Sequence, residues 1–432
     1  MRGPGAKPIF SAQRIETMGL IVQKFGGTSL ANAEKIHRAA RRAIRAKLDN
    51  NQVIVVVSAM DQSTDVLVDL AYQITDRPSR REMDQLLATG EQVSIALMAM
   101  AIHHAGHDAI SFTGGQIGLK TDRSYGRARI REITERGRIM SLLKDGSVVI
   151  VAGFQGVDEH LNTTTLGRGG SDTTAVALAA ALGAEVCEIY TDVDGIYSAD
   201  PRIVPEARKL EHIFTDEMLE LASLGSQVMH SRSIELAKNY NVRIHVRSSY
   251  TDAKGTDIVN ASSDLQQVIV RGAALKKNLA RVELGRVPNK PGIASEIFRR
   301  VAEKEVIVDD IIQVIHEGGT TADISFTIEA SEIDAAREIA QELAAEMPQM
   351  KVQVRDKMAK VSVVGVGMRT HTGVASRMFD ALHQAAVNIE NISTSEIVIS
   401  CVINQDDGEK ALRAVHAAFA LEQSPSPSAN GQ

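Results

Sequence analysis

The sequence predicts an α/β protein in which a three-layer N-terminal domain precedes two copies of a smaller unit. The first observation is an alternation of apolar strands and helical segments from Met18 to about Ser263. This pattern is typical of a mostly parallel sheet with helices on both faces. The second is an internal repeat in the C-terminal part, in which Gly292 and Gly373 occupy equivalent positions, 81 residues apart.

The composition excludes several classes of protein. The chain has 432 residues, a net charge of −6, 3% aromatic residues and no Trp. Nucleic-acid binding through a basic surface or base stacking is therefore not expected. The two cysteines, Cys187 and Cys401, are too few for a disulfide framework or a cysteine metal site, and they fit a reducing cytoplasm. No apolar run is long enough to span a bilayer, so no membrane association is expected.

The first strand leads into a glycine turn that carries a lysine. Leu20–Val22 is a short apolar strand, and Lys24, Gly26 and Gly27 follow it before an amphipathic helix expected over residues 31–47. Glycines let the backbone approach phosphate oxygens, and lysine supplies a compact positive charge. The pattern matches neither a P-loop nor a dinucleotide fingerprint. By itself, a lysine at the end of a strand is more often only solvated.

The later strands predict a common binding edge. Three β-branched runs are typical of buried parallel strands: Val53–Val57, Val148–Ala152 and Val186–Tyr190. A helical segment is expected over residues 81–101. Ligands of such folds bind at the carboxyl ends of the strands. The residues that follow strands, and that we expect on one rim, are Lys24, Ser58, Gly153 and Asp192.

A second glycine turn, residues 167–174, is the most informative segment of the chain. Three glycines flank Arg168, and Ser171 and Asp172 precede apolar helix formers from Ala175 to Leu182. Free backbone N–H groups at a helix N-terminus favour a bound anion. The alternative is a tight turn with Ser171 as an ordinary N-cap. Two glycine turns, each with one cation, suggest two anionic ligands brought together.

The C-terminal repeat reads β-α-β-β-α in each copy. The first copy gains a last strand at Lys351–Arg355, whereas the second ends near Leu421 without one. We expect a strand at Gln266–Val270 to complete the second sheet, which would interlock the two modules. The expected organisation is a disordered extension over 1–17, then 18–263, 264–357, 358–422 and a disordered Ser/Pro-rich tail over 423–432.

Several segments together resemble the amino acid kinase family and, within it, the aspartate kinases. They are Lys24–Ser29, Ser58–Met60 with Thr64-Asp65, Thr89–Glu91, Gly167–Thr174, and Thr191–Tyr197 with Asp200–Arg202. The resemblance extends from Met18 to about Leu421. It implies an α/β/α kinase domain followed by two ferredoxin-like (βαββαβ) ACT domains. It also implies ATP-dependent phosphorylation of the β-carboxylate of L-aspartate, with Mg²⁺ accompanying ATP and no protein ligand for the metal that can be named.

The resemblance also implies roles for individual residues. Lys24 would stabilise the transferring phosphoryl group, Arg168 would grip the substrate α-carboxylate, and Asp172 would orient Lys24 or the phosphates. The remaining substrate contacts would be Ser58, Thr64, Glu91 (to the α-ammonium group), Gly169, Gly170 and Ser171. The remaining nucleotide contacts would be Gly26, Gly27, Ser29, Ser171, Thr191, Asp192, Tyr197, Arg202 and Gln227.

Regulation and assembly follow from the same resemblance. ACT pairs bind amino acids at their mutual interface, so lysine or threonine is the expected effector and a homodimer or higher homo-oligomer the expected assembly. The matching positions are Asn289, Gly292, Ala294, Gln313, Asn388 and Ile389. Their alternative role is dimerisation alone. Two other functions stay open: another kinase of the same family, and a non-catalytic amino acid sensor on a kinase scaffold.

Overall fold

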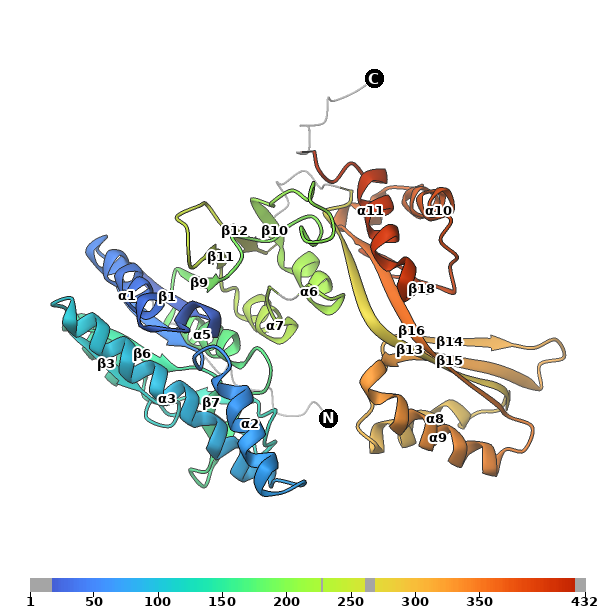
Figure 1. The fold of residues 1–432 in the computed structure, drawn as a ribbon, viewed down its shortest axis with the longest axis horizontal. Helices are drawn as coiled ribbons and strands as arrows, with labels where there is room; N and C mark the ends of the chain where they lie inside the picture. The colour runs from blue at the N-terminus through green and yellow to red at the C-terminus, as the bar shows by residue number, and fades with distance from the viewer. Residues whose placement is uncertain (1–17, 227, 261–268, 424–432) are drawn as a thin grey trace, which may run out of the picture. The chain divides into compact units, whose positions relative to one another are not determined.

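A computed structural model describes residues 18–226, 228–260 and 269–423, and these form two compact units (Figure 1). The described part of the first unit consists of residues 18–196, 209–223 and 228–260. The second contains residues 197–208, 224–226 and 269–423. The expected disordered extension over 1–17 lies outside the described residues, as does nearly all of the expected tail over 423–432.

The first unit is built on an eight-stranded sheet. Its strands, in spatial order, are β10 (His212–Phe214), β12 (Thr256–Val259), β11 (Ile244–Ser248), β9 (Val186–Thr191), β1 (Leu20–Phe25), β2 (Gln52–Val57), β6 (Val148–Ala152) and β3 (Ala109–Phe112). The strands from β11 to β3 are parallel, and β12 runs antiparallel to β11. All residues of β2 and β6 are buried, as expected for strands covered on both faces.

Helices cover both faces of this sheet. α1 (Ala33–Leu48) and α3 (Arg80–His104) pack with Phe25 in one apolar cluster. Lys24 precedes Phe25 in β1 and therefore points to the opposite face, where it contacts α5 (Gly170–Leu182). The predicted three-layer α/β/α architecture is confirmed.

The remaining elements of the first unit lie around this sandwich. A second, four-stranded sheet has the order β5 (Ile130–Ile133), β4 (Leu119–Thr121), β7 (Gln155–Val157) and β8 (Thr163–Thr165). The other helices are η1 (Gly27–Leu30), α2 (Ser63–Ile74), α4 (Arg136–Lys144), α6 (Thr215–Ser223) and α7 (Ser231–Tyr240). β8 leads directly into the second glycine turn, so this small sheet determines where that turn begins.

One helix of the described chain, α3, is long and apolar enough to cross a membrane by length and composition. Half of its most apolar window is nevertheless buried inside the protein, as in the core helix of a globular domain. The apolar cluster in which α3 packs with α1 includes Ile95, Met98 and Ile102 of α3.

The second unit is built on one six-stranded sheet. The strand order is β14 (Ile311–Ile315), β15 (Thr321–Glu329), β13 (Gly272–Pro288), β16 (Lys351–Val364), β18 (Val398–Asn404) and β17 (Asn391–Thr394). Its helices are α8 (Ile293–Glu303), η2 (Ala330–Glu332), α9 (Ile333–Glu346), η3 (Val366–Thr370), α10 (Val374–Gln384), η4 (Gln405–Asp407) and α11 (Gly408–Ala418). The two expected β-α-β-β-α copies are both present.

The two copies are interlocked through two long strands. The first half of β13, Gly272–Lys276, pairs with Lys360–Val364 of the second copy, and its second half belongs to the first copy. β16 serves both copies in the same way. The strand that completes the second copy is therefore Gly272–Lys276 and not Gln266–Val270: Ile269 and Val270 are not in a strand, and residues 266–268 lie outside the described residues.

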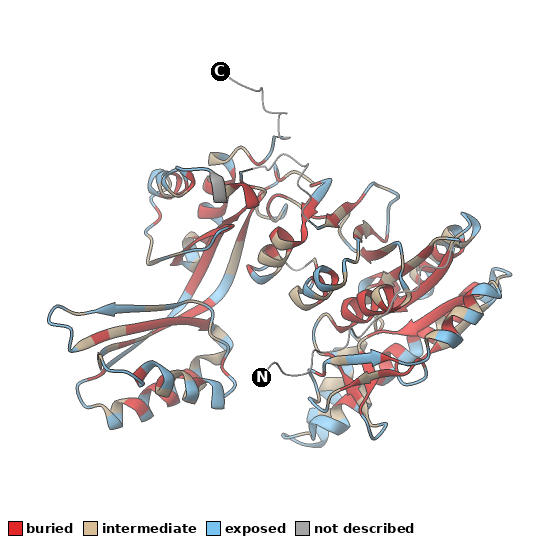
Figure 2. Ribbon diagram, turned by 180° about the vertical axis from the view of Figure 1, so that it is seen from behind, coloured by how far each residue is buried: buried red, intermediate tan, exposed pale blue. Residues whose placement is uncertain are grey.

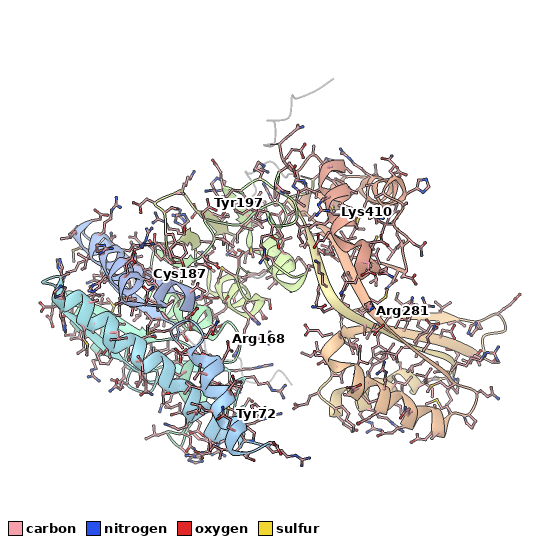
Figure 3. All side chains as sticks on the ribbon, viewed as in Figure 1. Tyr72, Arg168, Cys187, Tyr197, Arg281 and Lys410 are labelled. Carbon is pink, nitrogen blue, oxygen red and sulfur yellow. The ribbon has the colours of Figure 1, made fainter. Side chains whose placement is uncertain are left out.

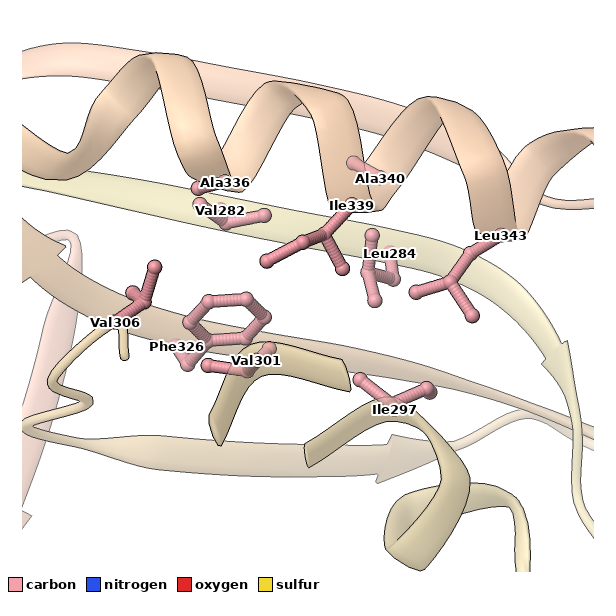
Figure 4. A pocket seen from close by; sticks show the side chains of 10 residues that line it. All are labelled: Val282, Leu284, Ile297, Val301, Val306, Phe326, Ala336, Ile339, Ala340 and Leu343. Carbon is pink, nitrogen blue, oxygen red and sulfur yellow. The ribbon is translucent and has the colours of Figure 1, made fainter. Parts of the chain in front are cut away.

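Each copy has its own apolar core. In the first, apolar side chains from β13, β15, α8 and α9 pack against one another (Figure 4). The core of the second copy includes Ala199, Val204 and Ala207 from the segment 197–208. This segment precedes the expected boundary near residue 263, yet its apolar side chains are buried in the second unit.

Candidate active site

The predicted rim is formed by the ends of four adjacent parallel strands, β9, β1, β2 and β6. Backbone hydrogen bonds continue the pairing beyond the strands. Gly26 N–H donates to Tyr190 O at 3.3 Å, Ser58 N–H to Phe25 O at 3.1 Å, and Gly153 N–H to Val57 O at 3.0 Å. Since the strands are parallel, the loops after them meet at one edge of the sheet, where ligands of α/β folds bind.

Lys24 and Asp172 form an ion pair at this edge. Lys24 Nζ lies 2.6 Å from Asp172 Oδ1, and the two side chains are only 12% and 10% exposed. Asp172 is held in the first turn of α5, where the helix dipole favours a negative charge. The pair joins the two glycine turns, because Lys24 precedes one of them and Asp172 follows Arg168 by four positions.

The second glycine turn leads into a helix, α5, that begins before its apolar run. α5 begins at Gly170, and its N-cap is Gly169, with a φ of 68°. Ser171 therefore lies inside the first turn, which removes the alternative of Ser171 as N-cap. Arg168 is exposed between Gly167 and Gly169, and Figure 3 labels its side chain. Among the described residues, no partner of its guanidinium group is recorded.

Glu91 is a buried carboxylate beside the rim. It lies in the middle of α3, so it is no helix cap, and it is 4% exposed. Its Oε1 accepts a hydrogen bond from Ala59 N–H at 3.0 Å, whereas Oε2 has no hydrogen-bond partner within the described part of the chain. Burial raises the pKa of Glu91 to about 7. An unpartnered buried carboxylate oxygen suits an ammonium group as ligand.

The first unit also contains other predicted substrate and nucleotide contacts. Ser58 is half-buried after β2, and Thr64 lies in the first turn of α2. Thr191 ends β9, and its hydroxyl donates to Asp192 at 3.1 Å. Ser29 is a less suitable ligand, because its buried hydroxyl already hydrogen-bonds the hydroxyl of Ser249.

Three of the predicted nucleotide contacts lie outside the described part of the first unit. Tyr197 and Arg202 belong to the second compact unit, where Arg202 forms an ion pair with Asp200 at 2.7 Å. Gln227 lies outside the described residues. In the part of the chain that the structure describes, no group of three or more His, Cys, Asp or Glu residues is arranged to hold a metal ion.

Sequence reasoning missed three residues that surround the Arg168 turn: Asp84, His230 and Arg232. A signal existed for one of them. Asp84 and Glu91 are seven positions apart, so they lie on one face of α3. The contacts of His230 and Arg232 join α7 to segments more than 60 residues away, and no local pattern predicts them.

The six predicted regulatory residues fall into two separate groups. Asn289, Gly292 and Ala294 lie at the turn from β13 to α8, and Gln313 lies in β14. Asn388 and Ile389 instead precede β17. β14 and β17 are the opposite edge strands of the six-stranded sheet, so one copy of the chain does not bring Gln313 and Asn388 together.

Comparison with known proteins identifies the family. The profile of the amino acid kinase family matches residues 19–248, more than half of the chain, and ACT-domain profiles match residues 280–346 and 361–419. The chain belongs to the amino acid kinase family. Within this family, it is 48% identical to the aspartate kinase of Pseudomonas putida over 94% of its own length and 98% of that protein. It is 50% identical to aspartokinase 2 of Bacillus subtilis over 95% of its length and 100% of that protein. The predicted membership of the aspartate kinases is confirmed.

Solved structures of family members have the same fold. E. coli aspartokinase III in complex with aspartate and ADP (R-state) matches with a TM-score of 0.78 and 26% identity, over 92% of this chain and 99% of that one. The same enzyme in complex with lysine and aspartate (T-state) matches with a TM-score of 0.73 and 25% identity, over 93% and 99% of the two chains. The predicted kinase domain with two ACT domains is thereby confirmed.

Proposed function

We propose that the chain transfers the terminal phosphoryl group of ATP to the β-carboxylate of L-aspartate, giving 4-phospho-L-aspartate and ADP. The observation that carries this proposal is the Lys24–Asp172 ion pair, which joins the Lys24 turn to the turn that bears Arg168. The names of the relatives support aspartate as the substrate. A carboxylate nucleophile is ionised at neutral pH, so the reaction needs no general base.

The difficulty of this reaction is electrostatic, because a substrate with two carboxylates must bring one of them close to a triphosphate. Lys24 supplies a fixed positive charge at the phosphoryl group, and the Asp172 carboxylate holds its ammonium group in place. Arg168 offers a planar donor for the substrate α-carboxylate, and the free oxygen of Glu91 accepts the α-ammonium group. Rigid placement of such charges accounts for much of the rate enhancement of phosphoryl transfer.

The first glycine turn suits a nucleotide phosphate. A Cβ atom on Gly26 would lie 3.6 Å from Lys24 Nζ, so the glycine leaves the space beside the ammonium group open. Thr191, which ends β9, and Asp192, which follows it, lie on the same rim and would contact the rest of the nucleotide. Mg²⁺, when bound with ATP, neutralises charge on the phosphates. Since no metal-binding cluster is present among the described residues, phosphate oxygens and water would hold most of its coordination sphere.

The ACT tandem supports regulation by an amino acid, with lysine or threonine as the effector. Gln313 lies on one edge strand of the six-stranded sheet and Asn388 precedes the opposite edge strand, so a site that contains both requires a second copy. Exposed apolar side chains on the edge strands, Ile311, Val314, Ile315 and Ile392, support a homodimer built through this sheet. The two free, buried cysteines support a cytoplasmic location.

A hydroxamate assay tests the reaction. The full chain is incubated with MgATP, hydroxylamine and one acceptor at a time: aspartate, glutamate, acetylglutamate or no acceptor. We expect hydroxamate and ADP to form with aspartate only. Product with another acceptor instead would assign a different amino acid kinase. No product with any acceptor, together with calorimetric binding of lysine or threonine, would identify a sensor and overturn the catalytic proposal.

A further inference from the structure

The turn that presents Arg168 is held on one side by Asp84 of α3. This aspartate is 1% exposed. Its Oδ2 accepts hydrogen bonds from Thr165 N–H at 2.7 Å and Gly126 N–H at 3.0 Å, and its Oδ1 accepts one from the Thr165 hydroxyl at 2.7 Å. One carboxylate therefore holds the segment at Gly126 and the segment at Thr165 together. The chain enters the Arg168 turn two residues after Thr165.

Arg232 of α7 holds the same two segments from the other side. Its Nη1 donates to Leu166 O at 2.7 Å, and its Nη2 donates to Ala128 O at 2.5 Å. Ala128 N–H in turn donates to Thr165 O at 2.8 Å, which closes a short ladder between the segments. Both prongs of the guanidinium group are used on backbone carbonyls, so Arg232 does not face a ligand.

The turn itself has little freedom between these supports. Gly167 and Gly169 both have positive φ, 78° and 68°. A Cβ atom on Gly167 would lie 2.8 Å from Gly126 O, and one on Gly169 would lie 2.2 Å from the Cβ of His230. Arg168 is thus held between two closely packed glycines. Gly126, beside the first glycine, donates a hydrogen bond to Asp84, and His230, beside the second, accepts one from Arg232 N–H at 3.4 Å.

We infer that Asp84 and Arg232 are positioning residues of the substrate clamp, acting through the backbone to aim the Arg168 guanidinium group at the substrate α-carboxylate. This inference rests on the proposed function, since it takes aspartate as the ligand of Arg168. A two-pronged contact requires both guanidinium donors to meet both oxygens, so a small displacement of the turn weakens it strongly. The effect should be larger for the amino acid substrate than for ATP, because both residues hold the segments that lead into Arg168, whereas the Lys24 turn is linked to them through Asp172.

Charged side chains suit this task better than neutral ones. A carboxylate offers only acceptors and meets three donors at Asp84, whereas an asparagine would present an N–H group to one of them. Burial is the largest influence on the pKa of Asp84 and raises it, while the three hydrogen bonds act in the opposite direction. Arg232 can reach two carbonyls at once because its donors form a rigid fork, and lysine cannot reproduce this.

Kinetics of matched variants test the inference in the full-length protein. Asp84→Asn and Arg232→Ala are compared with Asp158→Asn. Asp158 is 0% exposed and accepts hydrogen bonds from His160 N–H and Asn162 N–H in the turn between β7 and β8, at the far end of β8 from Arg168. Its Oδ2 also accepts a hydrogen bond from the hydroxyl of Tyr125, the residue before Gly126, at 3.1 Å. Asp158→Asn is therefore a strict control: it removes a buried carboxylate beside the same segment, but not one that holds Thr165 at the entry to the Arg168 turn. Melting temperatures establish that each variant is folded.

We expect Asp84→Asn and Arg232→Ala to raise KM for aspartate by roughly tenfold or more, with KM for ATP changed by less than about twofold. Asp158→Asn should lower the melting temperature without raising KM for aspartate more than KM for ATP. Millimolar guanidinium should lower the raised KM for aspartate of Arg232→Ala. The KM for aspartate of Arg232→Lys should stay raised. Unchanged KM for aspartate in folded Arg232→Ala, or equal changes in both KM values, would overturn the inference. An inactive wild-type protein would instead refute the proposed function.

Discussion

The catalytic unit and the ACT tandem both begin a helix with a left-handed glycine, but the two turns have different surroundings. Gly169 caps α5 with a φ of 68°, and Gly292 caps α8 with a φ of 97°. At Gly169, His230 occupies the place of a side chain, whereas no atom of the described residues lies within 4 Å of a Cβ built on Gly292. The same backbone conformation is therefore locked by packing in one turn and left open in the other.

The helices that follow these turns differ in the same way. Almost all of α5 is buried, whereas only Ile293, Ile297 and Val301 are buried in α8 (Figure 2). A fully packed helix start holds charged groups at fixed positions, which phosphoryl transfer requires. The open turn after β13 leaves space for an effector or a second copy. The comparison predicts large, localised effects in the first unit and small, effector-dependent effects in the second.

The largest effect is expected from the charge at the locked site. Lys24→Met should lower kcat by roughly a hundred- to thousand-fold, as for the loss of one preorganised charge donor. The control is Lys290→Met in the open turn before Gly292, where kcat without effector should change by less than about twofold. Initial rates of ADP release measure both. A fall of less than threefold in Lys24→Met would remove Lys24 from the mechanism.

The two glycines themselves give the next largest contrast. Gly292→Ala should lower the free energy of unfolding by about 1 kcal/mol, because alanine disfavours the positive φ. Gly169→Ala has this cost and also overpacks against His230, so it should lower the free energy of unfolding by roughly 2–5 kcal/mol in total. Urea denaturation midpoints of the two variants compare these costs. Gly169→Ala should also raise KM for aspartate, because the turn carries Arg168. Equal losses of stability would contradict the distinction between a locked and an open turn.

Glu91 predicts a pH dependence confined to the catalytic unit. Its pKa of about 7 means that it is protonated below this pH and cannot then receive the substrate ammonium group. We expect kcat/KM for aspartate to fall about tenfold per pH unit below pH 7. In Glu91→Gln, kcat/KM should be roughly 10- to 100-fold lower near pH 8 and should lack this pH dependence.

The same raised pKa affects stability with a definite sign. Because the folded-state pKa lies above the unfolded value of about 4.5, the contribution of Glu91 to stability is fully present below pH 4.5. It is lost as the pH rises through about 7. The stability of the wild type relative to Glu91→Gln should therefore decrease over this interval. A constant difference between pH 4.5 and 7 would assign the kinetic effect to another group.

The smallest effect is expected in the ACT tandem. Gln313→Ala on β14 removes one neutral hydrogen-bonding group from the predicted effector site. It should weaken inhibition by lysine or threonine by roughly two- to tenfold and leave kcat without effector unchanged. Titration calorimetry and inhibition curves measure this change. If neither amino acid binds the wild type, the regulatory assignment is wrong.

Much of the fold followed from local patterns in the sequence. Strand β6 agrees with the predicted Val148–Ala152 residue for residue, and α1 buries Ile36, Ala39, Ala40 and Ile44 as its helical period predicted. The sequence did not specify where α5 starts, because small and polar residues from Gly170 to Thr174 have weak helix propensity, which tertiary burial overrides. The strand Gln266–Val270 was misplaced because an apolar run does not specify which residues pair.

The sequence by itself determined the strands, the helix faces, the two cation-bearing glycine turns and the family, because each depends on residues close together in the chain. Only the tertiary structure decided that Asp84 and Arg232 meet at the Arg168 turn and that Gly272–Lys276 completes the second ACT sheet. It also assigned residues 197–208 to the second unit and separated Gln313 from Asn388. These facts depend on contacts between distant segments, and periodicity and turn chemistry carry no information about which distant segments pack together.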